Sequence, residues 1–178
     1  MATSGETIAY LIPPDTEIPS GGQVALVKKY TQIGQLYGAD CLQFQGQDVG
    51  KGSVSAAIWD FILRRSAAAS TGYTATTGLS VRVLWSAPKN SQAVAWAASF
   101  QLNGLTDLPN PIVENFPAFG SANEITVVTN CSTVAPFNLN VTTINVPLAA
   151  IKNGQATNPA QGDMVRLRLR RATDNAAD

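Results

Sequence analysis

The stretch "MVRLRLRR" (Met164–Arg171) alternates apolar and basic side chains. Successive side chains of a β-strand point to opposite faces of a sheet, so a period of two predicts a strand with one buried face. The apolar face would consist of Val165, Leu167 and Leu169. The other face would carry arginines about 6.6 Å apart, namely Arg166, Arg168 and Arg170.

Two stretches upstream alternate in the same way. They are "LSVRVLWSA" (Leu79–Ala87) and "AVAWAASFQL" (Ala93–Leu102), and the segment between them, "PKNSQ" (Pro88–Gln92), is rich in turn-forming residues. This spacing predicts an antiparallel hairpin. The apolar face of its second strand would consist of Val94, Trp96, Ala98, Phe100 and Leu102.

The remaining C-terminal segments also favour strands. "EITVVTNCS" (Glu124–Ser132) is rich in β-branched residues. "FNLNVTTINVPL" (Phe137–Leu148) alternates as far as Val141 and then shifts phase to Ile144, which predicts a β-bulge. "AAIKNGQATNPAQGD" (Ala149–Asp163) predicts a short helical turn or a loop. Together these patterns predict an all-β fold, a sandwich of two antiparallel sheets.

Residues 1–50 differ in character from residues 51–178, which we assign to the sandwich. Residues 1–23 contain three prolines and a Gly-Gly pair, yet they are also rich in apolar side chains, which a solvated linker would lack. We therefore predict an ordered, extended N-terminal arm that lies along another surface, such as a neighbouring subunit. The candidate interface residues of this arm are Ile8, Tyr10, Leu11 and Ile12.

Two segments leave helix and strand open. Gln23–Gln47 begins with apolar residues at helical spacing and ends in an alternating run, "DCLQFQGQ" (Asp40–Gln47). In Ser55–Ser70 the alanines favour a helix, whereas the apolar run at Ile58–Ile62 favours a buried strand.

The composition indicates a surface with little charge. The chain has 178 residues, 12 basic and 12 acidic, and only 13% of its residues are charged, which is about half the usual share. A neutral, polar surface suits a protein that is covered in an assembly, although a soluble monomer remains the alternative. No basic stretch precedes an apolar run at the N-terminus, and no apolar run reaches the length of a membrane span. We therefore expect synthesis in a cytoplasm and no membrane partner.

The residue types argue against an enzyme. The chain has no His, which removes the commonest general base and metal ligand. Cys41 and Cys131 do not form a CxxC pair, so we expect buried thiols and no zinc site. "GQDVGKGS" (Gly46–Ser53) lacks the spacing of a phosphate-binding loop and is interpreted as a turn. No spacing brings two carboxylates together as a glycosidase requires. We predict no catalytic residues, no metal and no cofactor.

The arginine row and the tryptophans each admit more than one interpretation. The arginines could form a solvated face or cross-strand ion pairs, contact a neighbouring subunit or a capsid, or bind nucleic acid. The neutral charge and the absence of interleaved aromatic residues argue against nucleic acid. Trp85 and Trp96 could stack on sugar rings, but the apolar neighbours of Trp96 favour a core or a subunit interface.

The C-terminal part of the chain resembles a pattern of bacteriophage virion proteins over roughly residues 54–178. In that pattern, a strand that ends in Trp and a small residue pairs with a strand that carries a second Trp, here Trp85 and Trp96. The pattern ends with a Gly-Asp pair, an alternating strand that finishes in Arg, and an Asp/Asn-rich turn, here Gly162 to Asn175. The pattern continues into a further strand, which we expect the N-terminal region or a neighbouring chain to supply.

The resemblance implies a jelly-roll module, commonly trimeric, on a phage head or fibre. We therefore expect a structural virion protein on the capsid surface, made in the host cytoplasm. Its role would be that of a capsid decoration (cement) protein, with itself and the major capsid protein as partners. The alternative is a tail-fibre or head-fibre module that recognises host glycans.

Overall fold

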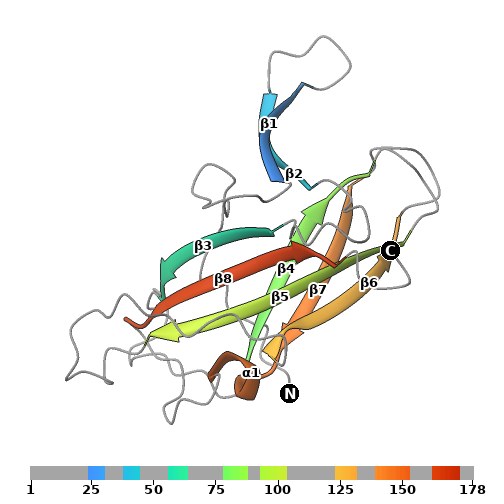
Figure 1. Cartoon of the computed structure of the whole chain (residues 1–178). Helices are drawn as coiled ribbons and strands as arrows, with labels where there is room; N and C mark the ends of the chain where they lie inside the picture. The colour runs from blue at the N-terminus through green and yellow to red at the C-terminus, as the bar shows by residue number, and fades with distance from the viewer. Residues whose placement is uncertain are drawn as a thin grey trace, which may run out of the picture.

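The computed structural model describes residues 24–30, 38–44, 56–63, 78–87, 93–103, 123–131, 139–152 and 162–172. These residues form an all-β protein with one short helix (Figure 1). The strands are β1 (Val24–Tyr30), β2 (Gly38–Phe44), β3 (Ala56–Ile62), β4 (Leu79–Trp85), β5 (Ala93–Asn103), β6 (Ile125–Asn130), β7 (Asn140–Val146) and β8 (Met164–Arg171). The helix, α1 (Leu148–Lys152), follows β7 as the predicted helical turn.

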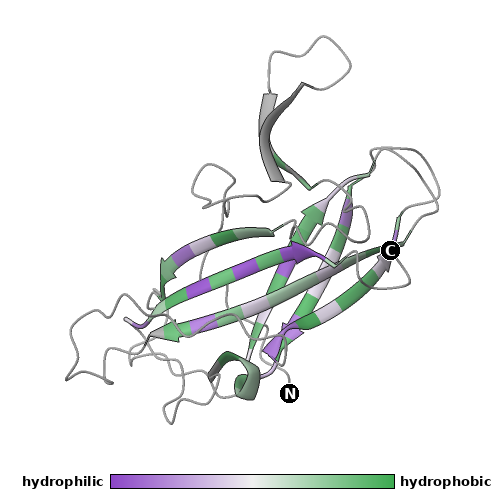
Figure 2. Ribbon diagram, in the orientation of Figure 1, coloured by the Kyte–Doolittle hydropathy of each residue, from purple (hydrophilic) through white to green (hydrophobic). Residues whose placement is uncertain are grey.

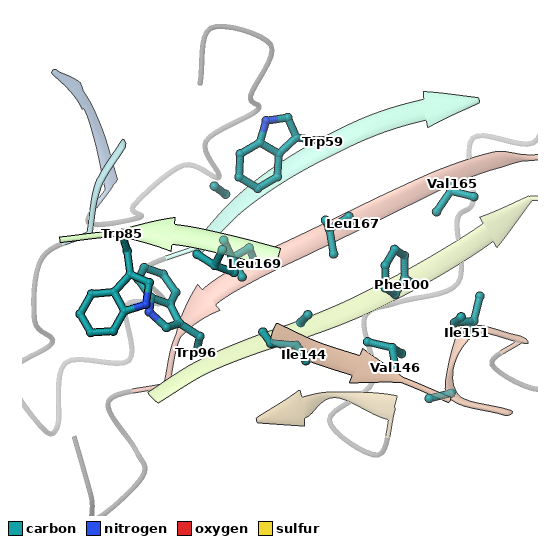
Figure 3. Packing of buried hydrophobic residues seen from close by; sticks show 14 of the residues in the cluster. Trp59, Trp85, Trp96, Phe100, Ile144, Val146, Ile151, Val165, Leu167 and Leu169 are labelled. Carbon is teal, nitrogen blue, oxygen red and sulfur yellow. The ribbon is translucent and has the colours of Figure 1, made fainter. Parts of the chain in front are cut away.

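The described strands form antiparallel sheets, and the main core lies between two of them. Four strands are hydrogen-bonded in the order β3-β8-β5-β6, while β4 pairs with β7 and β1 pairs with β2. The β4–β7 pair faces the four-stranded sheet, and apolar side chains from both fill the space between them (Figure 3). Helix α1 adds Ala150 and Ile151 to this core.

Strand β8 has the bounds and the faces that its alternation predicts. It lies between β3 and β5, and its side chains alternate in polarity along the strand (Figure 2). The apolar residues Val165, Leu167 and Leu169 are buried in the core. The arginines lie on the outer face, because neighbouring residues of a strand point to opposite sides.

The predicted hairpin between β4 and β5 is wrong. Strand β4 pairs with β7, with Leu79 opposite Val146, whereas β5 pairs with β6 and β8. The alternation of both strands is real, but it reports which face of a strand is buried and not which strand lies beside it. The two strands belong to facing sheets, and the rings of Trp85 and Trp96 meet in the core with centroids 6.1 Å apart.

The predicted bulge is also absent from the described strand β7. Each residue from Asn140 to Val146 pairs in turn with β4, so the register is continuous. The inner face is formed by Thr142, Ile144 and Val146. The phase shift in the sequence arises because a threonine takes an inner position while apolar residues before it point outward.

The N-terminal ambiguities resolve as strands. Val24–Tyr30, whose apolar spacing suited a helix, is strand β1, paired with β2 so that Val24 lies opposite Phe44. The Phe44 ring stands edge-on to Trp96 with a centroid distance of 5.0 Å, which joins this pair to the core. Residues Ala56–Ile62 form strand β3, paired with β8. The predicted arm of residues 1–23, including Ile8, Tyr10, Leu11 and Ile12, lies outside the described residues.

Candidate interaction surfaces

The first member of the arginine row pairs with an aspartate on the neighbouring strand. Arg166 lies directly opposite Asp60 of β3 in the β3–β8 register. Its guanidinium donates from Nε to Oδ1 and from Nη2 to Oδ2, both at 2.7 Å. The Asp60 side chain is 42% exposed, so this bidentate pair lies in a high dielectric and adds little stability.

The other two arginines share one carboxylate from further across the sheet. Glu124 immediately precedes β6, and Arg168 and Arg170 lie on β8, with β5 between them. Arg168 Nη2 lies 3.0 Å from Glu124 Oε2, and Arg170 Nε donates to the same oxygen at 2.8 Å. The Glu124 side chain is only 8% exposed, so this cluster is more strongly shielded from water than the Asp60 pair.

Small side chains on β5 make this long reach possible. Two strand spacings separate β8 from β6, about 9.6 Å. In the β5–β8 register, Ala97 lies opposite Arg170 and Ser99 lies opposite Arg168. The arginine side chains can therefore extend over β5, and Arg168 Nε donates to Ser99 Oγ at 3.2 Å on the way. Ala97 and Ser99 are fully buried although they lie on the outer face, which is consistent with long side chains covering them.

Each arginine of the row has a carboxylate partner within the chain. Burial lowers the pKa of Arg168 and nearby Arg170 adds to the effect, while Glu124 opposes it. The guanidinium nevertheless stays protonated near neutral pH. Among the described residues, the three arginines of the row contact two carboxylates, Asp60 and Glu124. The cross-strand interpretation of the row is thus confirmed; a role in subunit or capsid contact, and the absence of nucleic-acid binding, stay predictions.

The outer surface of the β4–β7 pair has a different character and was not anticipated. Its exposed apolar residues are Leu84 (62% exposed), Leu139 (67%) and Val141 (43%). Leu84 lies directly opposite Val141 in the register, so their side chains are neighbours. Because side chains alternate along a strand, counting back in steps of two from the inner residues Ile144 and Val146 would have placed Leu139 and Val141 on the outer face.

The tryptophans do not offer a surface for stacking. Trp59, Trp85 and Trp96 are between 5% and 7% exposed, and all belong to the core cluster, as predicted for Trp85 and Trp96 (Figure 3). Trp85 Nε1 donates to Thr142 Oγ1 at 2.8 Å, and Thr142 Oγ1 donates to Thr129 Oγ1 at 2.8 Å. This chain of hydrogen bonds links β4, β7 and β6, and it satisfies the buried hydroxyl of Thr142.

The chemical groups considered from the sequence are only partly described. Cys131 is a buried free thiol, as predicted. Within the described ranges, no group of three or more His, Cys, Asp or Glu side chains could hold a metal ion, and no helix is long and apolar enough to cross a membrane. The turn Gly46–Ser53 lies outside the described residues.

Comparison with known proteins gives no relative. No family model, no curated protein and no solved structure matches the chain.

Proposed function

We propose that the protein is a structural protein of a phage virion, a capsid decoration (cement) protein that stabilises the head through contacts between subunits. The observation that supports this most is the order of strand pairing. β3 pairs with β8, β4 with β7 and β5 with β6, so the three pairs are nested one inside another along the chain. Nested antiparallel pairs are what a long hairpin ribbon gives when it wraps into a jelly roll, a fold common in viral capsid domains.

The distribution of these pairs between sheets fits the same wrapping. The outer pair, β3–β8, and the inner pair, β5–β6, join through the contact of β5 with β8 to make the four-stranded sheet. The middle pair, β4–β7, makes the facing sheet. The chain thus passes from one sheet to the other between β3 and β4 and back again between β4 and β5. A jelly roll has eight strands in four such pairs; residues 104–122, between β5 and β6, lie outside the described residues.

The residues that carry the resemblance to phage virion proteins make two structural contacts, one between the sheets and one within the four-stranded sheet. Trp85 and Trp96 contact each other across the core from facing sheets. The Gly-Asp pair precedes β8, where Gly162 adopts a φ of 94° that favours glycine. Leu63 N donates to the Asp163 carbonyl at 2.9 Å and Gly162 N donates to the Leu63 carbonyl at 2.9 Å, which extends the β3–β8 ladder. These features support a structural role for the motif.

The mechanism we propose is mechanical. The protein acts as a homotrimer on the capsid surface, where the N-terminal arm and the edges of the sandwich contact neighbouring copies and major capsid subunits. Surfaces with few charges suit such contacts, because interface centres are depleted of charged residues. Several weak contacts made at once add affinity through multivalency. The proposal involves no catalytic step, no cofactor, no nucleic acid and no membrane.

Cosedimentation with capsid shells tests this proposal. Purified protein is mixed with shells that lack it, the shells are pelleted, and the bound protein is measured against its free concentration. We expect saturable binding at a fixed number of copies per shell and a higher melting temperature of the loaded shells. Protein that stays in the supernatant and remains monomeric at high concentration would overturn the proposal. Saturable binding on a glycan array without shell binding would favour the glycan-recognition alternative.

A further inference from the structure

We propose that the exposed β4–β7 surface binds the N-terminal segment Glu6–Ile12 of a neighbouring copy of this chain. This inference rests on the proposed function, because it names the contact by which copies of a decoration protein associate. The surface exposes three apolar side chains, Leu84, Leu139 and Val141, more than 40% each. Contiguous exposed apolar residues of this kind mark interaction sites.

The surface is apolar at one end and carries a positively charged side chain, Arg82, beside that end. Arg82 is exposed and lies on the same face of β4 as Leu84, two residues earlier, about 6.6 Å along the strand. Its cross-strand neighbour is Thr143, which carries no charge. Beyond Arg82 the surface becomes polar, where Ser80 donates a hydrogen bond to Asn145 Oδ1 at 2.6 Å. A fitting ligand therefore needs an acidic group followed by apolar groups at strand spacing.

The N-terminal segment has this chemistry. Residues 1–27 contain three acidic residues and no Lys or Arg, so this N-terminal part of the chain is acidic although the whole chain is neutral. Glu6, Ile8, Tyr10 and Ile12 alternate, and in an extended chain they would share one face at the same spacing of about 6.6 Å.

The two patterns match in order as well as in spacing. With Glu6 against Arg82, the next residue on the same face, Ile8, meets Leu84 and Val141. Tyr10 then meets Leu139, which precedes Val141 by two residues and so lies at the end of the surface away from Arg82. The charge pair would fix the register and direction, while the apolar contacts would supply most of the affinity.

The length of the chain allows the segment to reach another molecule. The described chain begins at Val24, so residues 13–23 separate it from Ile12. Eleven residues can span up to about 36 Å, more than the radius of a domain of this size. We assign the bound segment to a second copy, because this contact would join copies of the proposed decoration protein to one another. If copies in a ring exchanged segments, several contacts would form at once, and the ring would be more stable than a single contact allows.

Charge reversal tests the pairing. Arg82→Glu or Glu6→Arg alone places like charges together, and we expect each to weaken self-association about two- to tenfold per contact, measured by sedimentation velocity. The Arg82→Glu, Glu6→Arg double variant should recover the wild-type association constant. Circular dichroism confirms that each variant is folded; Arg82 is exposed, so the fold should tolerate its replacement.

Mixing the two single variants decides whether the segment comes from a neighbour. The Glu6→Arg chain offers its introduced arginine to the introduced glutamate on the surface of the Arg82→Glu chain. The Arg82→Glu chain offers its native Glu6 to the native Arg82 surface. Every contact between unlike chains therefore joins opposite charges. We expect the equimolar mixture to associate more strongly than either single variant alone, because in a ring of three that holds both variants two of the three contacts join unlike chains. If each chain covered its own surface, mixing would restore nothing, and that result would overturn the inference.

Leu84 provides the apolar test. We expect Leu84→Ser to weaken association about tenfold, because in the associated wild-type protein Leu84 would be buried against Ile8 of the neighbouring copy. Val128→Ser is the matched control, since Val128 is 41% exposed on β6 of the other sheet, and it should change association by less than about twofold. Equal effects of the two substitutions, or a wild-type protein that never associates, would contradict the inference. These measurements need no capsid, so protein that exchanges segments but binds no shell would overturn the proposed function alone.

Discussion

Glu124 and Arg170 form an ion pair across an intervening strand, over the side chain of Ala97. The alanine has no atoms beyond Cβ, so the arginine can extend from β8 over β5 towards the carboxylate. The same reach is repeated by Arg168 over Ser99. The small residues of β5 and the arginines of β8 thus belong to one arrangement, in which the arginine stems cover the strand that they cross.

Neutralising Glu124 should destabilise the fold. In Glu124→Gln, two partly buried arginines lose their charged partner, and we expect a loss of about 2–3 kcal/mol in the free energy of unfolding. Urea denaturation followed by tryptophan fluorescence measures this loss. The matched control is Asp60→Asn, whose pair with Arg166 is more exposed and should contribute less than about 1 kcal/mol. A smaller effect at Glu124 than at Asp60 would show that the shared carboxylate is not the main anchor of the row.

Enlarging Ala97 should separate the arginines from Glu124. Ala97→Leu places a branched side chain in a fully buried position under Arg170, and we expect a cost of about 1–3 kcal/mol. The control is Ala93→Leu, on the same face at the start of β5, where the side chain is only half-buried. Thermal unfolding compares the two variants. If Ala97→Leu is tolerated as well as Ala93→Leu, the small residue is not required for the ion pair.

Replacing Thr142 should expose the role of its hydroxyl. Thr142→Val keeps the shape of the side chain but leaves Trp85 Nε1 without its acceptor and Thr129 without its donor, at a cost of about 1–3 kcal/mol. Thr143→Val, at the exposed next position, should change stability by less than about 0.5 kcal/mol. Chemical denaturation gives both values, and near-ultraviolet circular dichroism of the tryptophans reports on the contact. Equal stability of the two variants would contradict this role.

The sequence allowed the faces of the strands to be predicted better than their partners. The alternation in Met164–Arg171 correctly predicted a strand with Leu167 inside and Arg168 outside, because burial of one face imposes a period of two. The same pattern predicted a hairpin of β4 with β5 that does not exist. Partner choice depends on how the whole chain wraps, and a period of two carries no information about that.

The surfaces were predictable only in part. The row of arginines was anticipated, but the partner of Arg170 was not, because Glu124 lies 46 residues away in the chain and across an intervening strand. The exposure of Leu139 and Val141 was missed since their hydrophobicity suggests burial. Their position follows from Thr142, a polar residue that is buried because Trp85 and Thr129 satisfy its hydroxyl.

A cryo-EM map of the assembled particle tests the central claim most directly. We predict density for this β fold on the outer surface of the capsid, at symmetry-related positions between major capsid subunits, with several copies in contact at each position. Particles that contain the protein only at the tail or its fibres, or capsids whose outer surface lacks it, would contradict the claim.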